Sequence, residues 1–419
     1  MSEENEWRKK ELSYKEVVTK YPDIAPLLIL KIDLCRRGVI YTQEALKHVD
    51  KNLHLISSDS YEGGLEIATS APNGFQLRDG SSVVRTDISK NLWKTHRTPY
   101  TVDWIDGKFY VTDENEVIEE IFLWEKPDFY NQKTSNGTPM TQIASARSQR
   151  FEIFPPHVCQ FGFPAKDRCK YCSMFLPSKE AQEYEGTDAY YQDVVETAKA
   201  AFAQKGRFAN VMMTAGSVLS GNELFEDELN SYIKILRAIG EAFNGKRFPM
   251  QIVASPFTIP QLERLKNETG ITTFDSDIEA TTHKWFSWLC PGKEKTLGFE
   301  NWKQRIFDAV DVFGKGHVNT GVVVGTELAN PDFNFTEEQA LKYVLESAEE
   351  FTSHNVTLTL NLWNACKGSI LYHHNNPSLD YYVQAAKGYA DLNRKYGLNI
   401  VPDDYRRCGN HANMDFLRI

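Results

Sequence analysis

Three cysteines near the middle of the chain have the spacing of a metal or iron–sulfur site. Cys159, Cys169 and Cys172 form a C-x9-C-x2-C pattern directly after an apolar run at 151–154. Thiolates at close spacing on a loop are typical ligands of zinc or of an iron–sulfur cluster. A structural zinc ion needs four closed ligands, so His157 would have to supply the fourth. A [4Fe–4S] cluster on three cysteines leaves one iron open to bind a substrate or cofactor.

The other four cysteines carry a weaker signal. Seven cysteines in a long chain that lacks a secretory signal argue against a disulfide framework. Cys35 lies in a predicted helix, and we interpret it as a small buried hydrophobic residue. Cys290, Cys366 and Cys408 follow late predicted strands or lie near the C-terminus. These three are candidates for an auxiliary metal site, although their wide separation gives no ligand spacing.

The residues after about position 150 alternate strand-like apolar runs with amphipathic helical stretches. Such an order predicts a parallel sheet with crossover helices, most simply a partial (βα)6 TIM-like barrel in an α/β fold. In that architecture, chemistry takes place on the loops at the C-terminal ends of the strands. The six predicted strands lie at 151–154, 208–213, 250–254, 271–278, 318–324 and 356–362. After the fifth strand, Thr336 and Gln339 have the spacing of a capping box that begins a helix.

The first part of the chain does not share this alternation. It contains predicted helices at 14–37 and 43–55 and a hairpin that turns at Asp106-Gly107. We interpret it as an N-terminal accessory α+β region that ends in a loop-rich linker. The sequence is thereby divided into an accessory region and linker at 1–139, a barrel at 140–400 and a C-terminal tail at 401–419 that closes the barrel.

The composition excludes several classes of protein. Of the 419 residues, 41% are hydrophobic and 25% are charged, which excludes a disordered or fibrous chain. The net charge of −10 argues against nucleic acid and anionic lipid as partners. No apolar run is long enough to span a membrane, and the charged N-terminus is no secretory signal, so a cytoplasmic location is expected. The sequence contains no P-loop, dinucleotide fingerprint or nucleophile elbow.

A three-cysteine loop after the first strand of a six-unit α/β series resembles the radical S-adenosylmethionine superfamily. The usual spacing there is C-x3-C-x2-C, so this chain has six extra residues in the first gap. The Cys-x-aromatic-Cys ending is kept, and the resemblance implies that Tyr171 lies against the adenine of the cofactor. The similarity covers roughly 140 to 415 and is closest to the biotin-synthase-related branch, on the residues Cys290-Pro291-Gly292-Lys293.

Three strand ends extend the resemblance. Thr214-Ala215-Gly216-Ser217 follows the second strand, where the superfamily has a Gly-Gly-Glu-like segment that receives the methionine amino group. The glutamate is absent, so backbone carbonyls and the Thr214 and Ser217 hydroxyls would take its place. Glu279 ends the fourth strand, where a carboxylate for the ribose hydroxyls is expected; a salt-bridged core carboxylate is the alternative. The fifth strand resembles a Gly-x-Ile-x-Gly-x-x-Glu stretch, one residue short, which implies that Val323 and Glu327 lie near the adenine.

The resemblance implies a biosynthetic iron–sulfur enzyme that cleaves S-adenosylmethionine reductively. Its cluster would be bound by Cys159, Cys169 and Cys172, and its electron would come from a reductant such as flavodoxin or ferredoxin. A small-molecule substrate is expected, with rearrangement or with C–S or C–C bond formation. Three alternatives remain open: an atypical cleavage that transfers the 3-amino-3-carboxypropyl group, a zinc-stabilised metabolite-binding protein without radical chemistry, and a non-catalytic relative that keeps the cluster as a scaffold. No catalytic residue is assigned. Lys293 is a candidate to bind a substrate carboxylate, and an ordinary surface lysine is the alternative.

Overall fold

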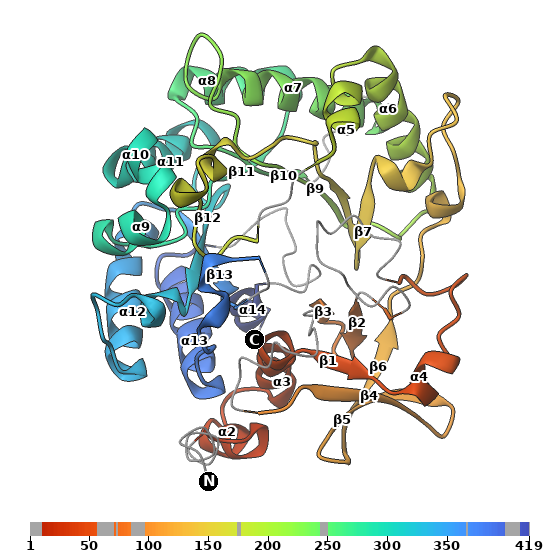
Figure 1. Ribbon diagram of the computed structural model, residues 1–419, viewed down its shortest axis with the longest axis vertical. Coiled ribbons are helices and arrows are strands. Elements are labelled where there is room, and N and C mark those ends of the chain that lie inside the picture. The colour runs from red at the N-terminus through yellow and green to blue at the C-terminus, as the bar shows by residue number, and fades with distance from the viewer. Residues whose placement is uncertain are drawn as a thin grey trace.

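Two curled β-sheets with helices packed around them form the fold (Figure 1). The expected mixed α/β class is confirmed, with each sheet curled like half of a barrel. Within the part of the chain that the structure describes, no helix is long and apolar enough to cross a membrane. The computed structural model describes residues 11–56, 71–72, 74–84, 97–173, 177–243, 250–365, 368–398 and 411–418.

The larger sheet has seven strands in the order β13-β12-β11-β10-β9-β8-β7. Strands β8 to β13 are parallel, and only β7 pairs antiparallel to its neighbour. All six predicted strands are present. The bounds are β7 (Ser145–Arg147), β8 (Arg150–Ile153), β9 (Asn210–Thr214), β10 (Met250–Val253), β11 (Thr273–Asp275), β12 (Val318–Val324) and β13 (Thr357–Leu362).

Strand β11 is shorter than the predicted strand at 271–278, and the reason is local. The Gly321 N–H donates to the Asp277 carboxylate at 2.7 Å, so a side chain replaces the next backbone partner. One further parallel bridge joins Glu279 to Val322. The chain after β11 therefore carries two carboxylates at the C-terminal edge of the sheet, where the site residues were expected.

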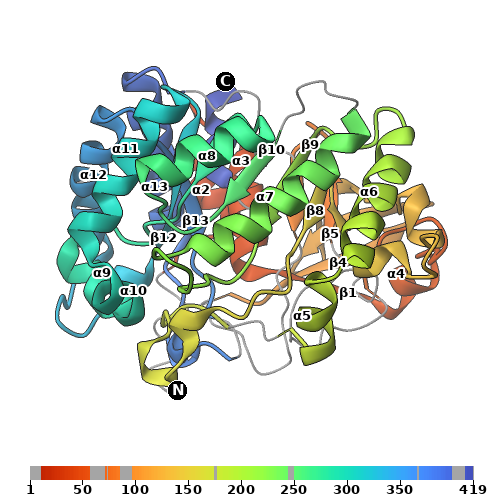
Figure 2. The ribbon, with the colours of Figure 1, turned by 90° about the horizontal axis from the view of Figure 1, so that it is seen from above.

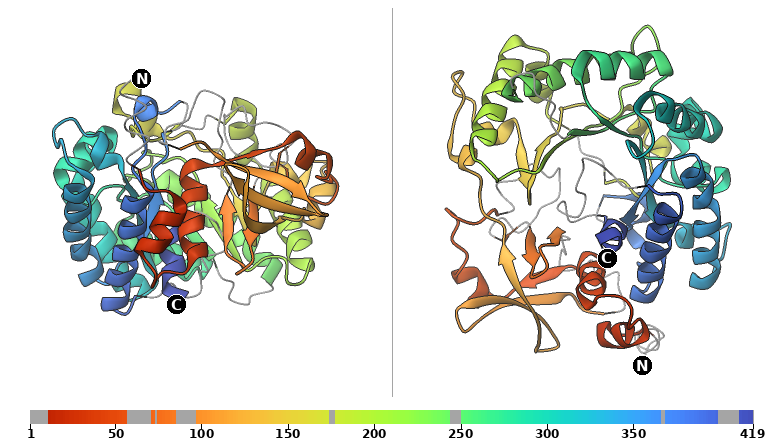
Figure 3. Two further views of the ribbon diagram at one scale, coloured as in Figure 1. Left: turned by 90° about the horizontal axis from the view of Figure 1, so that it is seen from below. Right: turned by 180° about the vertical axis from the view of Figure 1, so that it is seen from behind.

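Helices connect the parallel strands and cover the outside of the larger sheet (Figure 3). Thr336 and Gln339 form the predicted capping box at the start of α12. Gly397 follows α13 with a φ of 62°, as expected for a residue that ends a helix. These helices are α5 (Lys179–Glu185), α6 (Asp188–Ala203), α7 (Glu226–Gly240), α8 (Ile259–Thr269), α9 (His283–Leu289), α10 (Pro291–Thr296), α11 (Phe299–Phe313), α12 (Glu337–Ser353) and α13 (Leu379–Lys395).

The smaller sheet belongs to the N-terminal region and has the order β1-β4-β5-β6-β2-β3. The predicted hairpin joins β4 to β5, and Asp106 and Gly107 both have positive φ, at 47° and 85°. Such angles at both central residues are those of a tight primed turn. The bounds are β1 (Val39–Tyr41), β2 (Gly74–Leu77), β3 (Ser82–Val84), β4 (Tyr100–Ile105), β5 (Lys108–Asp113) and β6 (Glu116–Leu123).

Both predicted N-terminal helices were too long. The first is divided into α2 (Tyr14–Lys20) and α3 (Pro26–Arg37), because Pro26 begins a new helix and cannot continue the old one. The second, α4, ends at Lys47. There the Asp50 carboxylate accepts from the Asn52 N–H at 2.8 Å, and a local turn replaces the helix.

Helix α3 is buried between the smaller sheet and α13, although its last turns are highly charged. The Asp33 carboxylate accepts from Arg36 at 2.8 Å, from Arg37 at 3.2 Å and from the Tyr100 hydroxyl at 2.7 Å. Arg36 also donates to the Pro377 carbonyl at 3.1 Å, just before α13. The network joins the N-terminal region to the last helix of the larger sheet.

The end of the chain covers the outer edge of β13. Helix α14 (Ala412–Asp415) places Asn413 against this strand, where it accepts from the Leu360 N–H at 2.9 Å. Asp415 forms a buried ion pair of 2.5 Å with Lys31 of α3. The edge strand is thus protected from pairing with another chain. The proposed division at 139/140 and 400/401 stays a prediction, and residues 401–410 lie outside the described ranges.

Replacing Asp33 with Asn should destabilise the whole fold, because two buried guanidinium groups would lose their shared counter-charge. We expect a loss of about 3–5 kcal/mol in the free energy of unfolding, measured by urea denaturation. Glu116→Ala is the control: its ion pair with Lys15 joins side chains that are 59% and 63% exposed, so we expect a change below about 1 kcal/mol. Equal effects of the two substitutions would contradict this role for Asp33.

Candidate functional site

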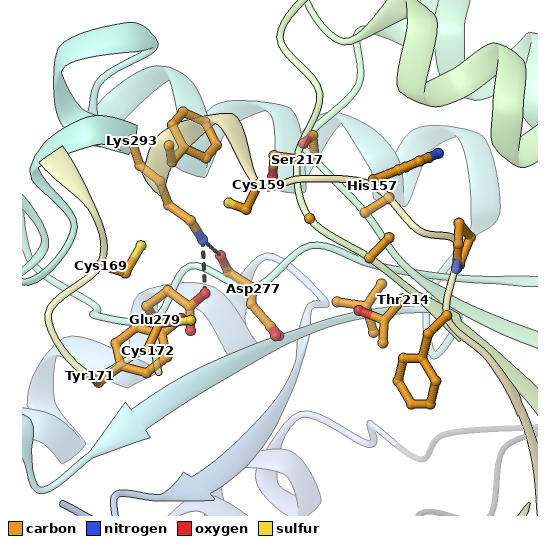
Figure 4. Close-up of a pocket in the computed structure, with 18 of the residues that line it drawn as sticks. His157, Cys159, Cys169, Tyr171, Cys172, Thr214, Ser217, Asp277, Glu279 and Lys293 are labelled. Atoms are coloured by element: carbon orange, nitrogen blue, oxygen red, sulfur yellow. Dashed lines mark hydrogen bonds and ion pairs between the residues drawn. The ribbon is translucent and has the colours of Figure 1, made fainter. Parts of the chain in front are cut away.

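A cavity of about 540 Å³ opens at the C-terminal ends of strands β8 to β11 (Figure 4). Parallel strands bring their C-terminal ends to one edge, so residues far apart in sequence meet there. Nine of the predicted site residues line this cavity: Cys159, Cys169, Tyr171, Cys172, Thr214, Ala215, Gly216, Ser217 and Glu279. The wall also contains Arg147, Phe154, Pro155, His157, Phe161, Ser173, Val253, Ala254, Ser255, Asp277, Lys293 and Trp302.

The loop that carries the three cysteines is held in place by backbone hydrogen bonds on both sides. The Gln160 N–H donates to the Ser217 carbonyl at 2.9 Å, and the Lys170 N–H donates to the Leu289 carbonyl at 2.9 Å. The loop is therefore attached to the end of β9 on one side and to α9 on the other. None of the three cysteines forms a disulfide, and burial raises the pKa of Cys159.

Gly216 allows the β9 end to lie directly against the first cysteine. A Cβ atom at position 216 would lie 2.3 Å from the Cys159 nitrogen and 2.6 Å from its Cα. No side chain fits at this distance, so the contact requires glycine. The closeness places the Thr214–Ser217 segment beside the cysteine loop, as the sequence led us to expect.

A buried ion pair lies opposite this contact. The Lys293 ammonium is 2.8 Å from a Glu279 carboxylate oxygen and 3.1 Å from the Asp277 carbonyl. It also lies 4.4 Å from the centre of the Trp302 ring, and the Tyr171 hydroxyl bonds to the same carboxylate. Figure 4 shows the lysine extending between the cysteines toward Glu279. Lys293 is thus a cavity residue rather than a surface lysine. Glu279 lies on the cavity wall, as a ribose-binding carboxylate would, and it is also the salt-bridged carboxylate of the alternative interpretation.

The protonation of the pair follows from burial and charge. Burial raises the pKa of Glu279, and Lys293 only partly opposes this effect. Burial would lower the pKa of Lys293, but Glu279 and the nearby Cys169 and Cys290 raise it above its ordinary value. Glu279 also has a φ of 66°, a strained value for a residue other than glycine, and such strain clusters at functional sites.

Cys290 lies beside the cysteine loop, although 120 residues of sequence separate it from Cys169. The Cys290 thiol donates a hydrogen bond to Cys169 and thereby lowers the pKa of Cys169. Cys290 is completely buried at the start of α10 and does not line the cavity. Cys366 and Cys408, the other two candidates for an auxiliary site, lie outside the described residues.

His157 is engaged elsewhere. Its Nε2 atom is 3.0 Å from the Ser231 hydroxyl and 3.3 Å from the Glu185 carboxylate, and its ring stacks on Tyr232. Figure 4 shows the ring pointing away from the three cysteines. The position therefore does not match that of a fourth ligand on the same metal ion.

The donor set fits a cluster better than a single ion. Among the residues with described positions, no three His, Cys, Asp or Glu side chains converge where one metal ion would sit. Zinc would need its sulfurs at about 2.3 Å from one point, whereas a cluster binds each cysteine through a different iron. The three cysteines lie around one cavity wall, which corresponds to the second arrangement.

Val323 and Glu327 do not line the cavity. Gly325 adopts a left-handed φ of 108°, and the Glu327 carboxylate folds back to accept from the Gly325 N–H at 2.8 Å. The same carboxylate accepts from the Tyr381 hydroxyl of α13 in a completely buried cluster. The tight turn, in a stretch one residue shorter than expected, directs this carboxylate toward α13.

The sequence did not single out Glu228, a buried carboxylate behind the cavity wall. It accepts from the Ser255 N–H and hydroxyl, both at 2.8 Å, and from the Val218 N–H at 2.9 Å. These bonds tie together the loops that follow β9 and β10. One feature of the sequence could have identified Glu228. It directly precedes Leu229, which lies on the apolar stripe of the amphipathic helix α7.

Comparisons with known proteins give partial similarities, and no family model matches the chain. The chain is 28% identical over 142 residues to bacteriochlorophyllide c C-7(1)-hydroxylase of Chlorobaculum limnaeum. That alignment covers 34% of this chain and 32% of the relative, so the match spans about a third of the relative's length.

Two solved structures also resemble parts or most of the chain. Methylornithine synthase has 13% identity and a TM-score of 0.37, with 64% of this chain and 76% of that chain covered. A radical SAM methyltransferase from Sphaerobacter thermophilus has 12% identity and a TM-score of 0.41, with 93% and 92% covered.

Replacing Gly216 with Ala should separate the β9 end from the cysteine loop, because the new methyl group would collide with the Cys159 backbone. We expect less than half of the wild-type iron per chain after anaerobic reconstitution, measured by colorimetric iron analysis. Gly186→Ala is the matched control. A Cβ atom at position 186 would meet only one atom, at 3.7 Å, and the φ of this residue is ordinary for an alanine. Wild-type iron in Gly216→Ala would show that the contact does not shape the site.

Glu327 should make the fold less stable as the pH rises from about 4.5 to 7. Burial raises its pKa from 4.5 to about 7, so the folded chain binds a proton that the unfolded chain has released. The stabilisation is complete below pH 4.5 and is lost as the pH rises through about 7, a change of roughly 3 kcal/mol. Glu327→Gln should remove this part of the pH dependence, measured by urea denaturation between pH 4.5 and 8. Parallel curves for the two proteins would contradict the assignment.

Proposed function

We propose that this chain is a radical S-adenosylmethionine enzyme with one [4Fe–4S] cluster on Cys159, Cys169 and Cys172. The observation that carries the proposal is the position of these three cysteines on the wall of one cavity, at the C-terminal ends of parallel strands. We further propose that the larger curled sheet and its helices form a partial (βα)6 barrel. The same proposal includes a relation of the chain to the biotin-synthase-related branch.

The residues on the cavity wall fit the cofactors chemically. When bound, the cluster supplies one electron that cleaves a C–S bond of S-adenosylmethionine and generates a carbon radical. Thr214 and Ser217 offer hydroxyls and carbonyls beside the first cysteine, suited to an amino group. Tyr171 offers an aromatic face for adenine, and the Glu279 carboxylate can accept from ribose hydroxyls. The buried wall also keeps water and other C–H groups away from a reactive radical.

Lys293 has an electrostatic role in this proposal. Its positive charge partly opposes the effect of burial, which raises the pKa of Cys159, and it acts together with the Cys290 hydrogen bond to lower the pKa of Cys169. Both effects favour the thiolate forms that bind iron. Its bonds to Glu279 and to the Asp277 carbonyl hold the ammonium in place. A buried positive charge near the sulfurs would also raise the reduction potential of a cluster, because it stabilises the more negative reduced form. Lys293 would therefore favour the uptake of an electron.

The size of the cavity favours a small-molecule substrate. Its volume of about 540 Å³ falls in the ordinary range of small-ligand pockets, roughly 300–1,000 Å³. We propose hydrogen abstraction from such a substrate, followed by rearrangement or by C–S or C–C bond formation. The hydroxylase relative is named for a reaction at a carbon atom of its own substrate, which agrees with chemistry at carbon.

The test is anaerobic purification and reconstitution, with iron, sulfide and zinc counted per chain. The protein is then reduced with dithionite in the presence of S-adenosylmethionine, and the products are identified by mass spectrometry. We expect about four irons and 5′-deoxyadenosine. Methylthioadenosine would instead support transfer of the 3-amino-3-carboxypropyl group. Stoichiometric zinc without cleavage would refute the proposal.

Simultaneous replacement of Cys159, Cys169 and Cys172 by Ala should abolish iron binding and cleavage of the cofactor. The loss follows because no other three cysteines of the described chain line the cavity. Cys35→Ala is the matched control: it removes a buried cysteine of α3, far from the loop, and should keep both iron and activity. A reducible cluster in the triple variant would refute the assignment of these three cysteines as the ligands of the cluster.

A further inference from the structure

The long gap between the first two cysteines forms an exposed tip on the cysteine loop. Phe163 is 56% exposed, and Pro164, Ala165 and Lys166 are exposed beside it. A single exposed aromatic side chain is ordinary on a protein surface. This one lies between Cys159 and Cys169, on the loop that carries the three cysteines.

The loop that carries this aromatic side chain, together with the adjacent helix α10, also carries four cations. Lys166 is exposed and Arg168 and Lys170 are half-buried on the same loop, and Lys295 of α10 is 70% exposed. The only carboxylate within the loop is Asp167, which pairs with Lys295 at 3.1 Å. Four cations and one carboxylate leave a local charge of about +3, although the whole chain carries −10. We call Phe163, Lys166, Arg168, Lys170 and Lys295 the basic tip.

The basic tip is rigidly connected to the thiols. Helix α10 lies on the loop so closely that a Cβ at Gly292 would be 2.5 Å from the Asp167 carbonyl. Arg168 donates to the Gly368 carbonyl at 2.7 Å, and the Lys170 ammonium lies 4.7 Å from the centre of the Trp288 ring. Figure 2 shows the loop at the edge of the molecule beside α10.

We propose that the basic tip is the docking surface for an acidic protein that carries single electrons. This inference rests on the proposed function, because a reductively cleaved cofactor needs an external electron. Transient redox complexes use small interfaces, and charge complementarity steers the partners together. An exposed aromatic ring among cations, on the loop that holds the thiols, suits a carrier whose redox centre is surrounded by carboxylates.

The electron balance of the docking step is simple. One electron leaves the reduced carrier, which is oxidised by one electron, and the iron–sulfur group is reduced by one electron. No covalent bond forms or breaks at the surface, and no proton is transferred there. The extra residues of the C-x9-C gap then serve the partner, while the three cysteines serve the cluster.

The test uses the reconstituted protein and two reductants. Reduced flavodoxin, an acidic carrier, is mixed with the protein in a stopped-flow instrument, and the loss of cluster absorbance gives a second-order rate constant. Formation of 5′-deoxyadenosine is measured in parallel with flavodoxin and with dithionite. The variants are Lys166→Glu with Lys295→Glu, and Phe163→Ser. Lys108→Glu, on the N-terminal sheet and 55% exposed, is the charge-matched control for a single reversal.

We expect the double charge reversal to lower the flavodoxin rate constant roughly tenfold or more at low salt, with a smaller difference at high salt. Phe163→Ser should lower it at every salt concentration, since its contact is apolar. Dithionite should reduce all variants at the wild-type rate, and Lys108→Glu should behave as wild type.

The possible failures are distinguishable. An unchanged flavodoxin rate in the charge-reversed variant would refute the docking surface while the proposed function stands. An equal loss with both reductants would mean that the tip supports the cluster structurally, which also overturns the docking proposal. No cleavage by the wild-type protein with dithionite would instead refute the proposed function itself.

Discussion

The buried ammonium of Lys293 is the interaction on which the arrangement of the site depends. A charge in the protein interior is costly unless other groups compensate for it closely. Here the Glu279 carboxylate, the Asp277 carbonyl and the Trp302 ring do so, and they come from the end of β11 and from α11. Because the lysine itself belongs to α10, its contacts hold this helix against the strand ends. The same charge faces the cysteine loop and favours its thiolates.

Two close backbone contacts also position the cysteine loop. Gly216 lets the end of β9 touch Cys159, and Gly292 lets α10 touch the carbonyl of Asp167. Both contacts exclude even a methyl group, so the cysteine loop is enclosed between β9 and α10. At the β13 edge of the larger sheet, the N-terminal region is joined to α14 by the Lys31–Asp415 ion pair and to the start of α13 by the hydrogen bond from Arg36 to the Pro377 carbonyl.

Much of the fold could be predicted from local patterns. Each of the six parallel strands was visible as an apolar run, and the hairpin at Asp106-Gly107 and the cap at Thr336 followed from turn and capping chemistry. The errors occurred where a single side chain competed with the backbone. Asp277 shortened β11, and Asp50 ended the helix that begins at Gln43. Such competition depends on a hydrogen bond that periodicity does not reveal.

The candidate chemistry of this protein could be read from local features of the chain. The three cysteines, the strand-end segment at Thr214–Ser217 and Glu279 were all identified from residue type, spacing and the order of the strands. Which distant groups lie beside them depends on how the chain folds. The tertiary structure paired Lys293 with Glu279, brought Cys290 to Cys169, and directed Glu327 toward Tyr381. These contacts form because the folded chain buries the groups together and their charges attract. The residues involved are far apart in the sequence, so no spacing pattern predicts that they will meet.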